Sequence, residues 1–179
     1  MKRLALPLVA SLALVAQAAL AQDYARPGFY ASLNGLYGVE LFDSAPSSFD
    51  VGNSVGVSGR LGYRITPAIA AEMQVDYGDF AKNGDFTETL FTLNGKYYFL
   101  QDQIQPYVLA GIGYEHATIE GRGMSFSESG FAYRVGGGVD WYFHRNVGLL
   151  LEMAYNSSTD SFLNDADYLS LGWGVFFRF

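Results

Sequence analysis

The final stretch of the chain, Asp167–Phe179, reads DYLSLGWGVFFRF. Large apolar side chains occupy every second position of it: Leu169, Leu171, Trp173, Val175, Phe177 and Phe179. A period of two is typical of a β-strand, because successive side chains of a strand point to opposite faces. The stretch therefore predicts a last strand with one face made entirely of large apolar groups, up to and including its terminal residue.

The same period of two runs through the rest of the chain and divides it into eight segments. Ordinary strands average about five or six residues, whereas a tilted strand that crosses a bilayer needs about nine to eleven. The segments are all longer than an ordinary strand, which favours strands that span a membrane. They cover residues 28–40, 51–64, 67–79, 86–99, 104–117, 129–143, 146–159 and 166–179.

The connections between these segments alternate in kind. Short or compact turns are expected at TP after Arg64, LQDQ after Phe99 and HR after Phe143. Longer polar loops are expected at LFDSAPSSFD, AKNGD, TIEGRGMSFSE and STDSFLND. Short turns at one rim and long loops at the other are typical of outer-membrane barrels, with the short side in the periplasm. The fold predicted is all-β: an eight-stranded antiparallel transmembrane β-barrel, an up-and-down meander with both termini periplasmic.

A secreted soluble β-sandwich would also alternate with period two. The position of the aromatic residues argues against it, because they gather near both ends of the segments, as the two interfaces of a bilayer require. One group lies on the short-turn side: Phe29, Tyr63, Tyr97, Phe99, Trp141, Phe143, Phe177 and Phe179. The other lies nearer the loops: Tyr37, Tyr77, Tyr114, Phe131, Tyr133 and Tyr155.

Three stretches, YRITPAIAAEMQVDY, QPYVLAGIGY and VGGGVDWYFHRNVGLLLEMAY, carry a family resemblance. They resemble the strand–turn–strand hairpins of small outer-membrane β-barrel proteins, the porin-like group of OmpA-like and OmpX-like eight-stranded barrels. The resemblance covers the chain after its leader and implies the fold and the outer membrane of a Gram-negative cell. The full-length OmpA type carries a periplasmic peptidoglycan-binding domain as well, and that function is not carried over to this sequence.

The N-terminal residues have the pattern of a secretory signal peptide. A positive start is followed by the apolar LALPLVASLALVAQAAL and by the small-x-small site Ala19–Ala21. We expect residues 1–21 to be the signal peptide, in preference to an anchor helix, and residues 22–179 to be the barrel domain. Without Lys2 and Arg3 the chain has 9 basic and 18 acidic residues, which disfavours a nucleic-acid partner. The chain contains no cysteine, so disulfide bonds do not hold the fold.

The alternation also predicts which side chains fill the barrel. The interior of an eight-stranded barrel is packed with side chains or holds one small ligand. Glu72 is expected at the depth of Arg60 and Lys96, and Glu115 at that of Arg134, so that opposite charges pair instead of remaining alone in the interior. The expected interior charge network comprises Arg60, Glu72, Lys96, Glu115, Arg134, Asp140 and Glu152.

The network has two interpretations: a polar core that blocks passage, which we favour, or the gate of a narrow channel for ions or small apolar molecules. Inward glycines either open a cavity for a small molecule or, as we favour, make room for large inward side chains. They are Gly111, Gly113, Gly136, Gly138, Gly172 and Gly174. No cofactor is expected.

Catalysis is a more remote alternative. Outer-membrane lipid A deacylases use a His-x-Ser pair on the lipid-facing wall; this chain has His116 and Thr118 there, with Glu120 as a conceivable carboxylate. We therefore predict no catalytic residues and no lipid A hydrolase activity. The long loops are acidic, and the spacing of their carboxylates matches no calcium-binding motif, so no metal site is predicted, although binding of divalent cations stays open.

The sequence thus predicts a non-enzymatic, monomeric outer-membrane protein with a role in envelope integrity or surface interaction. Its expected partners are outer-membrane lipids, lipopolysaccharide and the outer-membrane assembly machinery. The final strand resembles the signal that this machinery reads, and Phe179, Phe177 and Trp173 are its expected residues.

Overall fold

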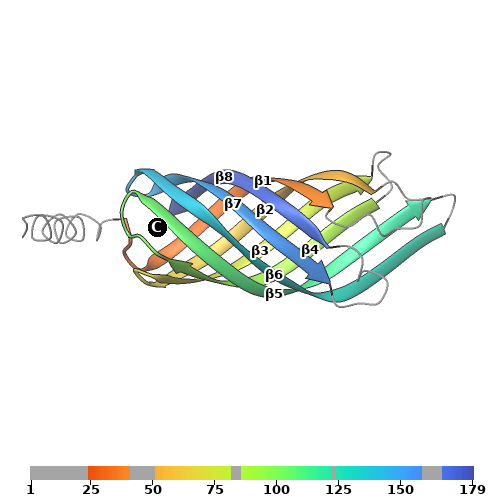
Figure 1. Ribbon diagram of the computed structural model, residues 1–179, viewed down its shortest axis with the longest axis horizontal. Coiled ribbons are helices and arrows are strands. Elements are labelled where there is room, and N and C mark those ends of the chain that lie inside the picture. The colour runs from red at the N-terminus through yellow and green to blue at the C-terminus, as the bar shows by residue number, and fades with distance from the viewer. Residues whose placement is uncertain (1–23, 41–50, 82–85, 122–123, 159–166) are drawn as a thin grey trace, which may run out of the picture.

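A single antiparallel sheet closes on itself in the computed structural model, with every strand paired to the next and β1 paired to β8 (Figure 1). The structure describes residues 24–40, 51–81, 86–121, 124–158 and 167–179. The strands are β1 (Gly28–Glu40), β2 (Val51–Thr66), β3 (Ile69–Ala81), β4 (Phe86–Tyr98), β5 (Ile104–Gly121), β6 (Met124–His144), β7 (Val147–Ser158) and β8 (Tyr168–Arg178).

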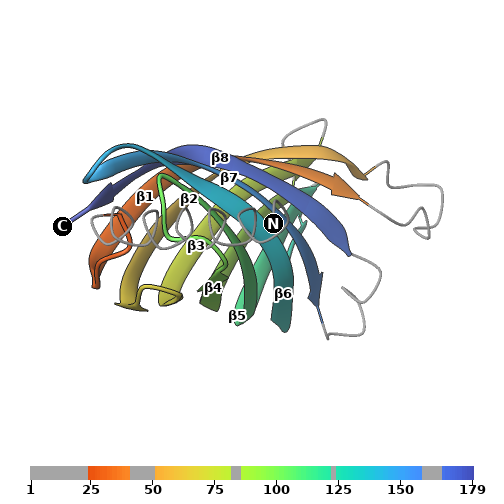
Figure 2. The same cartoon turned by 60° about the vertical axis from the view of Figure 1, so that its left-hand side comes forward.

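The strands run at an angle to the long axis of the barrel, as Figure 2 shows from a second side. Short connections join β2 to β3, β4 to β5 and β6 to β7 at one end, which we call the short-turn end. The C-terminal Phe179 lies at this end, where its backbone N–H donates to the carbonyl of Phe29. The predicted eight-stranded meander barrel is confirmed.

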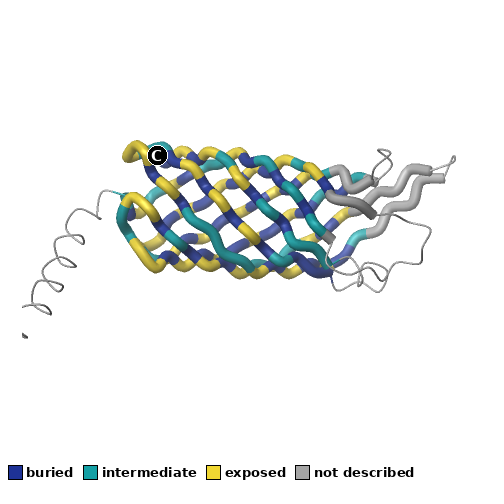
Figure 3. The backbone as a smooth tube through the Cα atoms, turned by 45° about the horizontal axis from the view of Figure 1, so that its top comes forward, coloured by how far each residue is buried: buried dark blue, intermediate teal, exposed yellow. Residues whose placement is uncertain are grey.

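Burial alternates along each strand with a period of two, as the tube in Figure 3 shows. In β7 the pattern over Gly148–Ala154 is buried, exposed, buried, exposed, with Glu152 inside and Leu151 and Met153 outside. Ile112 and Phe131 are each 71% exposed, which in water would be a costly arrangement for such large apolar groups. A hydrocarbon environment removes this cost, so the exposed face is the lipid-facing wall.

One predicted loop is wrong. Residues 118–128 were expected to form a polar loop, but β5 and β6 continue as a paired ladder as far as Gly121 opposite Met124. Polar residues do not prevent pairing here, because a ladder is held by hydrogen bonds between backbone groups. The two strands therefore form the longest hairpin of the barrel, at the end opposite the short turns (Figure 1).

Among the described residues, no helix is long and apolar enough to cross a membrane. The expected signal peptide, residues 1–21, lies outside the described residues. So do the predicted loop at 41–50 and all but the first residue of those at 81–85 and 158–165, where Ala81 and Ser158 end β3 and β7.

Candidate functional site: the barrel interior

The interior is lined by charged and polar side chains that are almost completely shielded from solvent. Strands β2 to β8 each direct at least one charged residue inward, because their inward positions fall on the polar half of the alternating pattern. The buried charged residues are Arg60, Arg64, Glu72, Asp76, Glu88, Lys96, Glu115, Arg134, Asp140, Glu152 and Arg178.

At the centre, two acids and two bases form a four-membered cluster. Arg60 donates from Nη1 and Nη2 to the two carboxylate oxygens of Glu152, at 2.8 and 2.9 Å. Lys96 Nζ donates to Glu72 Oε2 at 2.7 Å. The second partner of each base is more distant: Arg60 lies 3.8 Å from Glu72, and Lys96 lies 3.8 Å from Glu152. Each charge is thereby paired, which offsets the cost of removing it from water.

The pairing predicted between Glu115 and Arg134 is wrong. Arg134 instead donates to Asp76 at 3.0 Å and to Glu152 at 2.5 Å. The reason is the register: Arg134 stands opposite Gly111 in the β5–β6 ladder, whereas Glu115 stands opposite Gly130, four residues before Arg134 on β6. The alternation along β3 places Asp76 inside the barrel together with Glu72, but its contact with Arg134 across the barrel, from β3 to β6, has no signal in the spacing of the sequence.

Two tyrosine hydroxyls complete the cluster. Tyr30 donates to Glu72 at 2.9 Å, and Tyr107 donates to Glu152 at 2.7 Å. The Lys96 ammonium also lies 4.6 Å from the centre of the Tyr107 ring, within the range of a cation–π interaction. Glycines on neighbouring strands admit these rings, since a Cβ on Gly62 would overlap the ring of Tyr30 and one on Gly138 would press on Tyr107.

Towards the short-turn end the interior becomes aromatic. Asp140 accepts a hydrogen bond from Tyr98 at 3.0 Å, and it has no base within ion-pair distance among the described residues. Arg64 donates to Gln105 at 2.5 Å and stacks on the Tyr98 ring at 3.9 Å. Asp140 thus belongs to the interior but lies apart from the central cluster.

The N-terminal segment before β1 closes this same end. The ring of Tyr24 lies 5.6 Å from that of Tyr142, which packs with Leu150 and Phe176. The Tyr24 carbonyl accepts a hydrogen bond from Arg178, and the adjoining Ala25 is buried.

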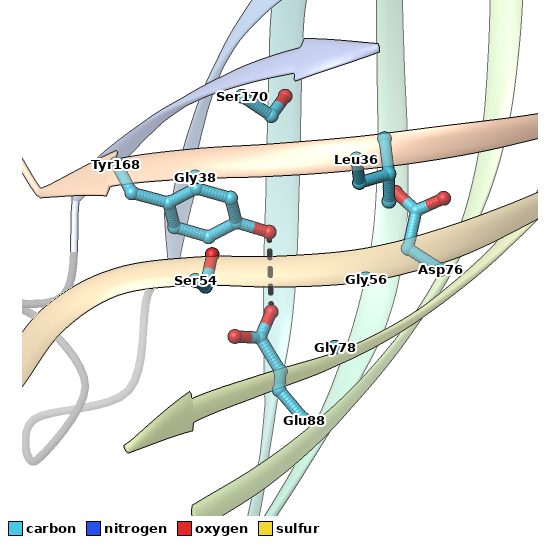
Figure 4. Close-up of a pocket in the computed structure, with 9 residues that line it drawn as sticks. All are labelled: Leu36, Gly38, Ser54, Gly56, Asp76, Gly78, Glu88, Tyr168 and Ser170. Atoms are coloured by element: carbon cyan, nitrogen blue, oxygen red, sulfur yellow. Dashed lines mark hydrogen bonds between the residues drawn. The ribbon is translucent and has the colours of Figure 1, made fainter. Parts of the chain in front are cut away.

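A small cavity lies at the opposite end of the interior, lined in part by Asp76, Glu88 and Tyr168 (Figure 4). The Tyr168 hydroxyl donates to Glu88 at 3.1 Å across it. Its free volume of about 20 Å³ holds one or two water molecules. Glu115 is buried near this end of β5, with no base in ion-pair contact among the described residues. No group of three potential metal ligands occurs in the described part of the chain.

The lipid-facing wall carries an aromatic row and, directly beside it, a polar row. Phe91, Tyr114 and Phe131 are direct partners across β4, β5 and β6, and Thr89, His116 and Ser129 are the partners two residues nearer the long hairpin. His116 Nδ1 lies 2.7 Å from Ser129 Oγ. The sequence interpretation missed Ser129, which only the register reveals.

Several candidate residues for catalysis or cation binding have side chains outside the described part of the chain. The side chains of Thr118 and Glu120 lie outside the described part of the chain, and no carboxylate contacts His116 among the described residues. Of the acidic loop residues, Asp167 is described, and it accepts a hydrogen bond from Tyr155 at 2.5 Å. The others, Asp43, Asp50, Asp79, Asp85, Glu120, Glu128, Asp160 and Asp165, have no described side chains.

A closed barrel with an apolar outer wall and a polar, ion-paired interior is a transmembrane β-barrel, because closure satisfies every strand edge in lipid. The family of outer membrane protein beta-barrel domains matches residues 8–179, and the chain belongs to this family. Its place is therefore the outer membrane of a Gram-negative cell.

Solved structures agree on the fold. The N-terminal β-barrel domain of Pseudomonas aeruginosa OprF is 18% identical, with a TM-score of 0.61, over 86% of this chain and 100% of that one. Neisserial surface protein A is 21% identical, with a TM-score of 0.67, over 85% and 97%. The outer membrane protein OprG from Pseudomonas aeruginosa is 14% identical, with a TM-score of 0.62, over 88% and 98%. No curated protein matches significantly.

Proposed function

We propose that this barrel is a non-enzymatic, monomeric outer-membrane protein that maintains the envelope or contacts the outside of the cell, and that its interior does not conduct. The observation that supports this most is the central cluster together with the two ion pairs of Arg134. Arg60, Lys96 and Arg134 reach across the interior to Glu72, Asp76 and Glu152, so one paired layer connects strands on opposite sides of the barrel. A solute would have to break these pairs in order to pass.

The orientation proposed has both termini and the short turns in the periplasm, after removal of residues 1–21 as a signal peptide. The long β5–β6 hairpin then faces the outside, where the acidic loops would meet lipopolysaccharide. The apolar wall fits a lipid environment, since its exposed residues are large and its aromatic row adjoins a polar row at one end. The final strand would be the signal that the assembly machinery recognises, through Trp173, Phe177 and Phe179.

A channel for ions or small apolar molecules and a lipid A hydrolase are the competing functions. The first would require the central cluster to open, and the second a nucleophile that His116 could activate. Ser129 stands in contact with His116, but a hydrolase also needs an orienting carboxylate and a site that stabilises an oxyanion.

The proposal is tested in cells that lack the gene. We expect such cells to become more sensitive to detergents or to adhere less to surfaces, with unchanged uptake of small solutes and unchanged lipid A acylation by mass spectrometry. Slower uptake of a small solute with an intact barrier would favour the channel. Lipid A that changes on expression of the wild type, but not of Ser129→Ala, would favour the hydrolase.

A further inference from the structure

The pair of Arg60 and Glu152 joins two strands that are not neighbours. Arg60 lies on β2 and Glu152 on β7, and the closing strands β1 and β8 lie between them in the barrel. Both side chains are buried, and two parallel N–H···O bonds of 2.8 and 2.9 Å join them. Two parallel bonds fix the orientation of both groups more tightly than a single contact does.

The connection passes directly over the inner face of the seam, which we define as the β1–β8 ladder. Glu152 stands opposite Gly172 in the β7–β8 ladder, and Gly172 stands opposite Leu36 in the seam itself. A Cβ on Gly172 would lie 3.3 Å from Nη2 of Arg60. The guanidinium therefore rests on Gly172, where a larger side chain would displace it.

Over most of their described length, the two strands of the seam are not joined by polar contacts between their own side chains. Between Tyr30–Gly38 and Ser170–Arg178, no side-chain hydrogen bond or ion pair joins the two strands directly. The backbone ladder and the packing of adjoining side chains hold them together. The bond between Arg60 and Glu152 adds a connection that does not depend on the ladder.

We propose that the Arg60–Glu152 pair is a clasp that keeps the barrel closed at its seam. Separation of β1 from β8 moves β2 away from β7, which breaks both hydrogen bonds of the pair. The contact of Lys96 on β4 with Glu72 on β3 joins neighbouring strands, and it persists when the seam opens. The clasp thus forms only on closure and slows every route of unfolding that begins at the seam, whatever the barrel does in the cell.

The absence of native cysteine permits a direct test with engineered disulfides. Leu33 on β1 and Val175 on β8 are direct partners on the lipid-facing wall, and a disulfide between cysteines at these positions would lock the seam. Met73 on β3 and Leu93 on β4 are the matched control pair elsewhere in the sheet. Arg60→Met and Lys96→Met are each made in the cysteine-free, seam-locked and control-locked proteins.

The measurement is the rate of unfolding in guanidinium after reconstitution into phospholipid vesicles. In the cysteine-free protein, Arg60→Met is expected to unfold at least about tenfold faster, because it breaks a buried pair. The oxidised seam disulfide should remove most of this acceleration, whereas the β3–β4 disulfide should leave it. The acceleration caused by Lys96→Met should persist in the seam-locked protein.

An Arg60→Met effect of equal size in the seam-locked and cysteine-free proteins would overturn the clasp and make the pair an ordinary part of the packed interior. If Arg60→Met does not fold, Arg60→Lys replaces it, since the ammonium keeps the charge but cannot form two parallel bonds. Arg60→Lys is expected to accelerate unfolding less than Arg60→Met, and this acceleration must again disappear in the seam-locked protein. An acceleration that persists there contradicts the proposal.

Discussion

Replacement of Glu152 by glutamine removes the negative charge that interacts with three buried bases of the interior. Its carboxylate accepts hydrogen bonds from Arg60, Arg134 and Tyr107, and it lies 3.8 Å from Lys96. Glutamine has nearly the same shape and keeps one carbonyl oxygen as an acceptor. The substitution therefore changes the charge while it leaves the packing of the barrel almost unaltered.

The expected loss in the free energy of unfolding depends on which acidic partners Arg60, Lys96 and Arg134 keep in the Glu152→Gln variant. Loss of one partner of a buried ion pair costs about 3–5 kcal/mol. Arg134 keeps Asp76, and Lys96 keeps Glu72, but Arg60 keeps only the 3.8 Å contact with Glu72. The free energy of unfolding should fall by about 3–5 kcal/mol, well below the sum of the separate hydrogen bonds, because the amide still accepts one of them.

The matched control is Glu115→Gln, which also removes a buried carboxylate but breaks no ion pair among the described residues. Its effect is expected to stay below about 1 kcal/mol or to be stabilising, because an unpaired buried charge is itself costly. Unfolding at pH 7 in urea is followed in lipid vesicles by the fluorescence of Trp141 and Trp173, both about half exposed on the outer wall. A Glu152→Gln variant within about 0.5 kcal/mol of the wild type, the spread of substitutions far from any such feature, would refute the reasoning, as would an equal loss in Glu115→Gln.

Three further results are expected. Tyr107→Phe should lower the free energy of unfolding by about 1.5–3 kcal/mol in the same assay, because it removes one hydrogen bond to the charged Glu152 and keeps the ring. Gly172→Leu should lower it further than Gly95→Leu, an outward substitution, because only the first displaces Arg60. Phe179→Ser should reduce insertion into the outer membrane, measured by fractionation, more than it reduces the stability of the refolded barrel. An equal loss of insertion and of stability would contradict a role of Phe179 as a signal for the assembly machinery.

The arrangement of strands and the two faces of the wall could be predicted from the sequence because both depend on the alternation of side chains. A strand puts every second residue on one side, so the pattern around Leu151, Glu152 and Met153 fixes inside and outside without knowledge of any neighbour. The limits of a hairpin do not follow from the same signal. The β5–β6 ladder continues through a polar stretch of the sequence, since pairing between backbone groups does not require apolar side chains.

The pairing inside the barrel was predictable only in part. Glu72 and Lys96 lie on neighbouring strands, and β3 begins at the short-turn end where β4 ends, so counts from the two short turns give their relative depth. The contacts of Arg134 with Asp76 and of Arg60 with Glu152 cross the interior, where the tilt of the strands and the length of the side chains decide which groups meet. No spacing along the chain encodes that distance.

The central claim is that the paired interior closes the barrel to solutes, and single-channel recording tests it most directly. Purified wild-type protein in a planar bilayer at neutral pH should give no conductance steps, whereas a variant in which Arg60, Lys96 and Arg134 are all replaced by alanine should admit ions. Discrete steps from the wild type, comparable in size to those of the variant, would contradict the account and identify the barrel as a channel.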